Sequence, residues 1–157
     1  MAIIIENGSI VAGANSYASE SQLSDYADVR GISLLTAQKE LLLRSMDFIE
    51  QLDYVGSRLT KDQPLQWPRD NVFIDGFSYS KSEIPPQLIK AQLAVAISIN
   101  AGFDPLSTIE RATKKEKLDV LEVEYQDNAS ATPVIRAVNA AIRKIVKGGG
   151  ALELRRW

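Results

Sequence analysis

The chain has 157 residues and a formal net charge of −2, with 45% hydrophobic and 24% charged residues. This composition is typical of one soluble globular domain. Cysteine and histidine are both absent, which excludes disulfides, thiolate nucleophiles, zinc sites built on those residues and the commonest general base. No signal peptide is expected because Glu6 interrupts the isoleucine run, and no segment reaches the roughly 20 apolar residues of a membrane span.

The first 18 residues are expected to form a short hairpin or arm followed by a loop. Asn7-Gly8 lies between two apolar runs, and Asn-Gly favours the type I′ turn of a hairpin. Ser19 and Gln22 then match the capping-box pattern at the start of a helix. The sequence therefore predicts a helix over 20–30.

A longer helix is predicted over 34–53. Leu35, Leu42, Met46 and Ile49 recur at helical spacing and form one apolar stripe. After this helix, proline and glycine punctuate a segment without a sustained period, which predicts a long irregular loop over 54–84. Ordered loops of this length tend to be functional.

Three further elements are expected after the loop. Pro85-Pro86 predict the start of a helix over 86–101. Alternating side chains predict one short strand at 120–125, and an apolar face predicts a last helix over 132–147. The fold class that follows is mainly α: a small bundle of about four helices in one domain over 1–147, with its helical core at 19–147 and a flexible, extended C-terminal tail at 148–157.

Charge is distributed unevenly along the chain. From Pro133 onward six basic residues face one acidic residue, which gives +5 and leaves −7 for the remainder. Such a basic end is typical of a surface that meets an acidic partner or nucleic acid. The simpler interpretation, which we prefer on charge alone, is a solvated helix end, because lysine and arginine are favoured near helix C-termini.

No catalytic pattern is present. Glu122 and Glu124 would share one face of a strand, but a solvated strand face explains them better than an acid–base pair. The triple glycine at 148–150 lacks the Lys-Ser/Thr of a phosphate loop. The sequence therefore predicts a non-enzymatic protein without a cofactor or metal.

Three segments together resemble one known family. The first is Glu6-Asn7-Gly8 followed by Ala14-Asn15-Ser16-Tyr17. The second is the long helix followed by Gln63-Pro64-Leu65-Gln66-Trp67-Pro68-Arg69, and the third is Ile84-Pro85 opening an alanine-rich helix. In order and spacing, roughly the first hundred residues resemble the head-to-tail adaptor proteins of tailed bacteriophages. These are also labelled neck, tail-completion or head-tail connector proteins, and some are labelled DnaT-like single-stranded-DNA-binding proteins.

The resemblance implies a structural protein of the virion neck, assembled in the bacterial host cytoplasm. It implies a homo-oligomeric ring, matching a twelve-fold portal, that connects the DNA-filled head to the tail. Its partners would be the portal protein, further copies of itself, and a downstream stopper or tail-terminator protein. Double-stranded DNA would pass through its channel, and no membrane partner is implied.

The motif residues also have structural interpretations. Trp67 is expected to be buried with its indole N–H bonded, and Arg69 to pair with a carboxylate or cap a carbonyl. The motif would then pin the long loop against the second and third helices. Asn15 and Ser16 are expected to bond nearby backbone. The structural-motif residues are Gln63, Leu65, Trp67, Pro68, Arg69, Asn15 and Tyr17.

The tail is expected to dock on a partner, because tryptophan and arginine are enriched at binding hot spots. By analogy with neck adaptors this partner would be the portal. The alternative is that the tail folds back, with its tryptophan covering a gap near the last helix. The tail residues expected to bind are Leu152, Leu154, Arg155, Arg156 and Trp157.

Two other function classes compete with the neck adaptor. A primosomal type of single-stranded-DNA-binding module would combine a basic groove with exposed stacking aromatics. Aromatics make up only 7% of the chain, and the basic end contains no aromatic residue before Trp157. A hydrolase has no motif to support it.

Overall fold

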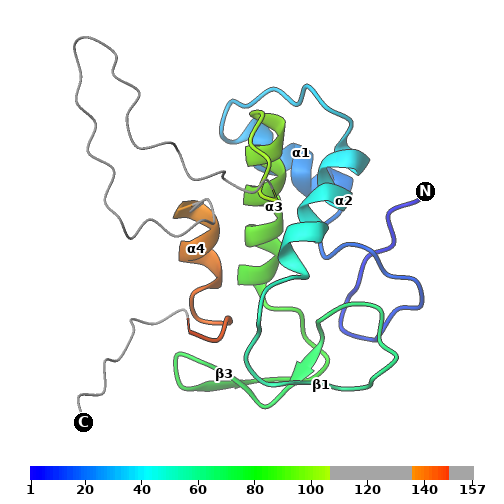
Figure 1. Cartoon of the computed structure of the whole chain (residues 1–157), viewed down its shortest axis with the longest axis vertical. Helices are drawn as coiled ribbons and strands as arrows, with labels where there is room; N and C mark the ends of the chain where they lie inside the picture. Colours follow the sequence, from blue (N-terminus) through cyan, green and yellow to red (C-terminus); the bar gives the residue numbers. More distant parts are fainter. Residues whose placement is uncertain (107–135, 149–157) are drawn as a thin grey trace, which may run out of the picture.

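The computed structural model describes residues 1–106 and 136–148. Helix α3 (Pro86–Asn100) lies at the centre and packs against α1 (Glu20–Asp28), α2 (Gln38–Ile49) and α4 (Arg136–Ile142). Figure 1 shows α2 and α4 on opposite sides of α3, with the strands gathered below the helices. Among the described residues, no helix is long and apolar enough to cross a membrane.

The predicted fold class is wrong: the protein is mixed α/β rather than a mainly α bundle. Two small antiparallel sheets lie within the segment predicted to be irregular. Strand β1 (Ser57–Arg58) pairs with β2 (Arg69–Asp70), and β3 (Val72–Ile74) pairs with β4 (Phe77–Tyr79). These pairs are short, so hydrophobic periodicity alone does not reveal them.

The β3–β4 hairpin nevertheless has a clear local signal. Its two-residue turn is Asp75-Gly76, with φ of 53° and 83°, and Asp-Gly is a preferred pair for a type I′ turn. The register places Ile74 opposite Phe77 and Phe73 opposite Ser78. The dipeptide rule that was applied to Asn7-Gly8 would have predicted this hairpin correctly.

At Asn7-Gly8 the expected hairpin is wrong. The carboxylate of Glu6 is buried and accepts the backbone N–H groups of Gly8 at 2.8 Å, Ile10 at 3.0 Å and Val11 at 2.9 Å. This carboxylate folds the segment into a closed loop, and Ile5 forms a single parallel bridge with Ser16 instead. Gly8 is required there, because a Cβ would lie 2.0 Å from the carbonyl oxygen of Ser82.

Helices α1 and α2 begin differently: α1 has a side-chain cap, whereas α2 has none. The predicted capping box is present on α1, where Ser19 accepts from the Gln22 N–H and the Gln22 side chain accepts from the Ser19 N–H. Helix α2 begins later than predicted, so Leu35 precedes the helix and is 85% exposed rather than part of its buried stripe. The side chain of Asn100 holds this segment by accepting the Leu35 N–H at 2.8 Å.

Helix α3 has a polar residue inside the core. Gln92 is fully buried and accepts the N–H groups of Tyr17 and Ala18, both at 3.0 Å. It donates to the Ser16 hydroxyl at 2.8 Å. Because a buried amide is costly unless bonded, these contacts fix the segment before α1 on the surface of α3.

The chain after α4 returns to the start of the long loop. Val55 N–H donates to the Ile145 carbonyl at 2.9 Å, and Lys147 N–H donates to the Asp53 carbonyl at 2.7 Å. Residues 145–147 therefore line up antiparallel to residues 53–55. The predicted strand at 120–125 and the predicted tail from residue 149 onward lie outside the described residues.

Candidate functional site

We define the Trp67 loop as residues 54–70, which contain most of the motif predicted from the resemblance. Tyr17 connects this loop to the helices: its hydroxyl donates to the Glu50 carboxylate at 2.5 Å and accepts the Trp67 N–H at 3.2 Å. The other oxygen of that carboxylate accepts the Gln66 N–H at 2.8 Å. Burial raises the pKa of both Tyr17 and Glu50. The network ties the loop to the end of α2.

Gln63 folds the loop from within. Its side-chain oxygen accepts the N–H groups of Leu59 at 2.9 Å and Thr60 at 3.1 Å, and its amide donates to the carbonyls of Leu65 at 2.9 Å and Pro68 at 3.0 Å. All hydrogen-bonding atoms of this buried amide therefore serve the loop backbone, and none is directed at a ligand.

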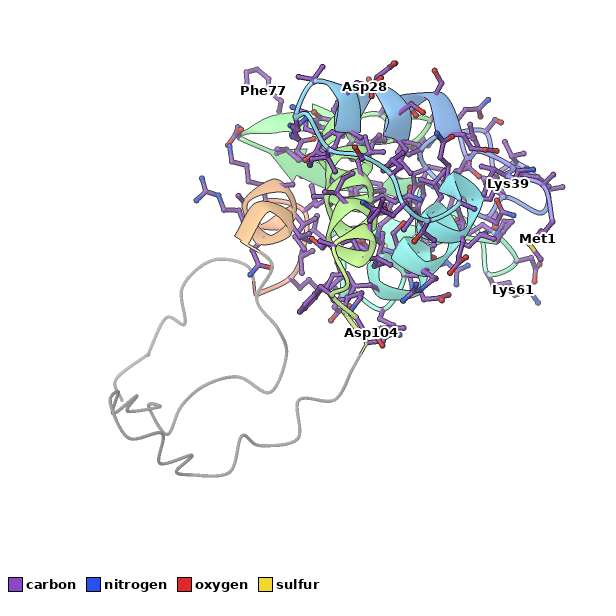
Figure 2. The ribbon with its side chains drawn as sticks, turned by 90° about the horizontal axis from the view of Figure 1, so that it is seen from above. Met1, Asp28, Lys39, Lys61, Phe77 and Asp104 are labelled. Atoms are coloured by element: carbon purple, nitrogen blue, oxygen red, sulfur yellow. The ribbon has the colours of Figure 1, made fainter. Side chains whose placement is uncertain are left out.

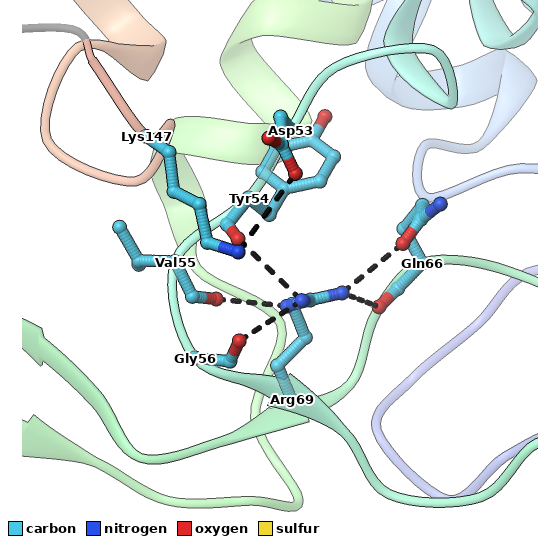
Figure 3. Close-up of polar contacts among 7 residues, drawn as sticks. All are labelled: Asp53, Tyr54, Val55, Gly56, Gln66, Arg69 and Lys147. Atoms are coloured by element: carbon cyan, nitrogen blue, oxygen red, sulfur yellow. Dashed lines mark hydrogen bonds and ion pairs between the residues drawn. The ribbon is translucent and has the colours of Figure 1, made fainter.

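Arg69 acts in the same way from β2. Its guanidinium donates to the carbonyls of Val55 at 2.8 Å, Gly56 at 3.0 Å, Tyr54 at 3.4 Å and Gln66 at 3.2 Å (Figure 3). Arg69 therefore caps carbonyls, one of its two expected roles. Because the side chain is only 7% exposed and its donors are occupied, it is not available to bind a phosphate.

Trp67 is 1% exposed and packs edge-on against Tyr54, with 5.6 Å between ring centroids. The peptide bond between Trp67 and Pro68 is cis. Its indole N–H has no hydrogen-bond partner, so the expectation that this group is bonded is wrong. The motif residues in the Trp67 loop thus lie together. Their contacts hold the loop backbone in place and leave no site open to a ligand. Asn15 lies apart from it and bonds the N-terminal backbone at Ile4 and Ala2.

Among the described residues, two exposed phenylalanines lie elsewhere, on the β3–β4 hairpin. Phe73 is 64% exposed and Phe77 is 73% exposed. Phe73 lies on the face opposite the buried Val72 and Ile74, whereas Phe77 lies beside the turn. Figure 2 shows Phe77 projecting from the hairpin away from the body of the molecule.

Three basic residues lie just after α4, and one of them, Lys144, contacts the hairpin turn. Arg143, Lys144 and Lys147 are all exposed. Lys144 Nζ lies 2.6 Å from Asp75 Oδ2 in the hairpin turn, and Lys147 Nζ lies 3.9 Å from Asp53 Oδ1. We call this set the hairpin–α4 surface; it consists of Phe73, Asp75, Phe77, Arg143, Lys144 and Lys147. The sequence shows the three cations of its basic end, but the contact between Lys144 and the hairpin turn is visible only in the structure.

A groove of about 540 Å³ lies between α1, α3 and α4. It is lined by Tyr26, Val29, Lys90 and Leu93, among others. The Arg30 guanidinium lies 3.5 Å from the centroid of the Tyr26 ring. Over residues 1–106 and 136–148, no group of three or more acidic, histidine or cysteine residues could hold a metal ion. The predicted tail site, Leu152 to Trp157, lies outside the described residues.

Comparison with family models gives one match, to the family described as "Putative DnaT-like ssDNA binding protein", over residues 1–157. The chain belongs to this family. Membership confirms the predicted relationship to DnaT-like proteins. The family match covers the whole chain, whereas the resemblance covers roughly the first hundred residues. No curated protein and no solved structure matches the chain. None of these comparisons points to a head-to-tail adaptor.

Proposed function

We propose that this protein binds single-stranded DNA through the hairpin–α4 surface. The observation that carries the proposal is that the hairpin with two exposed phenylalanines is joined, through the pair of Asp75 and Lys144, to the exposed basic segment after α4. Proteins that bind single strands without sequence preference combine these two features, since aromatic rings stack on bases and cations follow the backbone. The family description supports the same ligand.

The positions of the two rings favour an unpaired strand over a duplex. Phe73 and Phe77 come from neighbouring strands and lie on different sides of one narrow hairpin. A strand that crosses the hairpin end can place one base on each ring, because unpaired bases expose both faces. In a duplex the faces are already stacked, so the rings would lose this contribution.

The charge distribution supports a local contact of moderate strength. The whole chain carries −2, so the rest of its surface repels DNA and orients the strand toward the basic end. With at most three phosphates contacted by described residues, the logarithm of the affinity should fall with the logarithm of salt concentration with a slope of about −2.

The test is fluorescence anisotropy of a labelled oligothymidine with the whole chain at two salt concentrations. We expect Phe77→Ala and Phe73→Ala each to weaken binding at least fivefold, since stacking contributes about 1–3 kcal/mol per base. The matched control is Leu35→Ala, because Leu35 is also a large exposed apolar residue, 85% exposed, but lies near the opposite end of α3. Absence of binding by the parent, or equal affinities for all three variants, would overturn the proposal.

The head-to-tail adaptor is the second candidate. The feature that favours it is the groove between α1, α3 and α4, where Val29 is 84% exposed beside an apolar lining. Exposed apolar residues at a groove are typical of protein–protein contacts. In this proposal the chain is a non-enzymatic ring subunit that binds itself, the portal and a stopper or tail-terminator protein in the virion neck.

Sedimentation of the chain with purified portal rings tests this second candidate. We expect co-sedimentation that Val29→Asp abolishes while the unfolding transition of the variant stays unchanged. If the chain fails to join portal rings, or if Val29→Asp joins them as well as the parent, the adaptor proposal should be dropped.

A further inference from the structure

One ion pair lies at the centre of the hairpin–α4 surface. Lys144 Nζ and Asp75 Oδ2 are 2.6 Å apart, and the two side chains are 43% and 58% exposed. The pair joins the hairpin turn to the chain after α4. Its acidic member, Asp75, is two residues before Phe77 in the sequence. Solvent and ligands can therefore reach both partners, and the pair holds the cation that contacts the hairpin turn.

We propose that Asp75 stands in for a DNA phosphate in the free protein, so that single-stranded DNA binds by displacing Asp75 from Lys144. The inference rests on the single-stranded-DNA binding proposed above and adds a competing group within the same site. A carboxylate and a phosphate accept the same charge-assisted hydrogen bonds from an ammonium group. Exchange is inexpensive because an exposed ion pair is weak.

The sequence of the turn shows that the carboxylate is not needed for the hairpin itself. Residue 75 adopts φ of 53° and is followed by Gly76 at 83°. Asn-Gly satisfies this turn as well as Asp-Gly does. Asp75→Asn therefore removes the charge and keeps the backbone, which makes it a clean probe of the competition.

The ion pair of Lys147 with Asp53 is longer than that of Lys144 with Asp75. Lys147 Nζ and Asp53 Oδ1 are 3.9 Å apart, with 83% of the Asp53 side chain exposed. This distance is beyond a hydrogen bond. Of the three cations in the hairpin–α4 surface, only Lys144 makes a close pair with a carboxylate in the described structure. Competition is therefore expected at Lys144.

Anisotropy titrations of four proteins test the proposal: the parent, Asp75→Asn, Lys144→Ala and the double variant. We expect Asp75→Asn to bind oligothymidine about two- to fivefold more tightly, which is the fold-change that corresponds to a weak exposed pair. Lys144→Ala should bind more weakly and reduce the salt slope by about 0.7. In the Lys144→Ala background, Asp75→Asn should have little further effect, because the competition requires both partners.

Asp62→Asn is the charge-matched control. Asp62 is exposed and follows Lys61, which lies on the side of the molecule away from Phe77 (Figure 2). An Asp75→Asn gain no larger than that of Asp62→Asn, or one that persists without Lys144, would reduce the effect to general repulsion and overturn the inference. If Phe77→Ala and Lys144→Ala weaken binding but Asp75→Asn does not strengthen it, only the competition fails. If the parent does not bind DNA, both proposals fail.

Discussion

The Trp67 loop and the hairpin–α4 surface contain the same kinds of side chain in opposite surroundings. In the loop, the guanidinium of Arg69 is 7% exposed and bonded to backbone carbonyls, next to a ring that is 1% exposed. On the surface, Lys144 is 43% exposed and Phe77 is 73% exposed. In the loop the donors of the cation are bonded to the chain's own backbone and the ring is buried, whereas on the surface both the cation and the ring are accessible to a ligand.

The strongest way to break this comparison is Trp67→Ala. We expect a loss of about 3–5 kcal/mol in the free energy of unfolding, because a fully buried ring leaves a cavity. Urea denaturation of the variant measures it. Trp67→Phe should cost less, since it also removes the unpaired indole N–H. A Trp67→Ala protein with parental stability but impaired assembly or DNA binding would show that Trp67 belongs to an interface.

Arg69→Leu should have the next largest effect. The change leaves the carbonyls of Tyr54, Val55 and Gly56 without their donor, and we expect a loss of about 2–3 kcal/mol. Thermal unfolding measures it. Arg69→Lys keeps the charge but cannot reach all of these carbonyls, so it should lie between the parent and Arg69→Leu. If Arg69→Lys has the full stability of the parent, the positive charge of Arg69 stabilises the loop, and the several N–H donors of its guanidinium do not.

The pH dependence of stability tests the buried carboxylate of Glu50, which bonds Tyr17 and Gln66. Burial raises the pKa of Glu50 above its ordinary 4.5, although hydrogen bonds from Tyr17 and Gln66 oppose the shift. The folded protein therefore binds this proton more tightly than the unfolded chain does. The contribution of Glu50 to stability is full below about pH 4.5 and is lost as pH rises through the folded pKa.

Comparison with Glu50→Gln isolates that contribution, because glutamine does not titrate. The stability of the parent relative to the variant should fall as pH rises above about 4.5 in urea denaturation at a series of pH values. A difference that rises with pH would mean that the hydrogen bonds outweigh burial, and that the pKa of Glu50 is lowered instead.

Phe77→Ala should have the smallest effect on folding. Because the ring is 73% exposed, we expect the free energy of unfolding to change by less than about 0.5 kcal/mol. The same variant is expected to lose DNA affinity, so the two measurements together separate a binding ring from a packed one. A large loss of stability would place Phe77 among the packed residues and weaken the contrast.

The starts of α1 and α3 could be predicted from the sequence because their signals are local, whereas α2 (Gln38–Ile49) is shorter than the predicted 34–53 and the last helix ends at Ile142 rather than at residue 147. Ser19 and Gln22 locate the start of α1, and Pro86 locates the start of α3. The class was mispredicted because β1 and β2 pair across ten residues of loop, with two residues in each strand. The Asp75-Gly76 pair is the local sequence signal that indicates the β3–β4 hairpin.

In the candidate site, too, the local part could be predicted from the sequence and the long-range part could not. The motif at 63–69 is expected to fold the loop, and the side chains of Gln63 and Arg69 do bond its backbone, whereas the Trp67 indole N–H has no partner. The hairpin–α4 surface depends on contacts such as Asp75 with Lys144, which are 69 residues apart. Exposure of Phe73 and Phe77 also follows from tertiary packing, since phenylalanine in a sequence is more often a core residue.

The antiparallel contact between residues 53–55 and 145–147 has a consequence for synthesis on the ribosome. The two segments are about ninety residues apart in the chain. Synthesis proceeds at about 5–20 residues per second, so roughly 5–20 s pass between the synthesis of Val55 and that of its hydrogen-bond partner Ile145. During that interval Arg69 can already cap the carbonyls of the loop, while the Val55 N–H has only water to bond. The nascent chain thus carries one open edge until residue 147 emerges, and α4 completes the domain last.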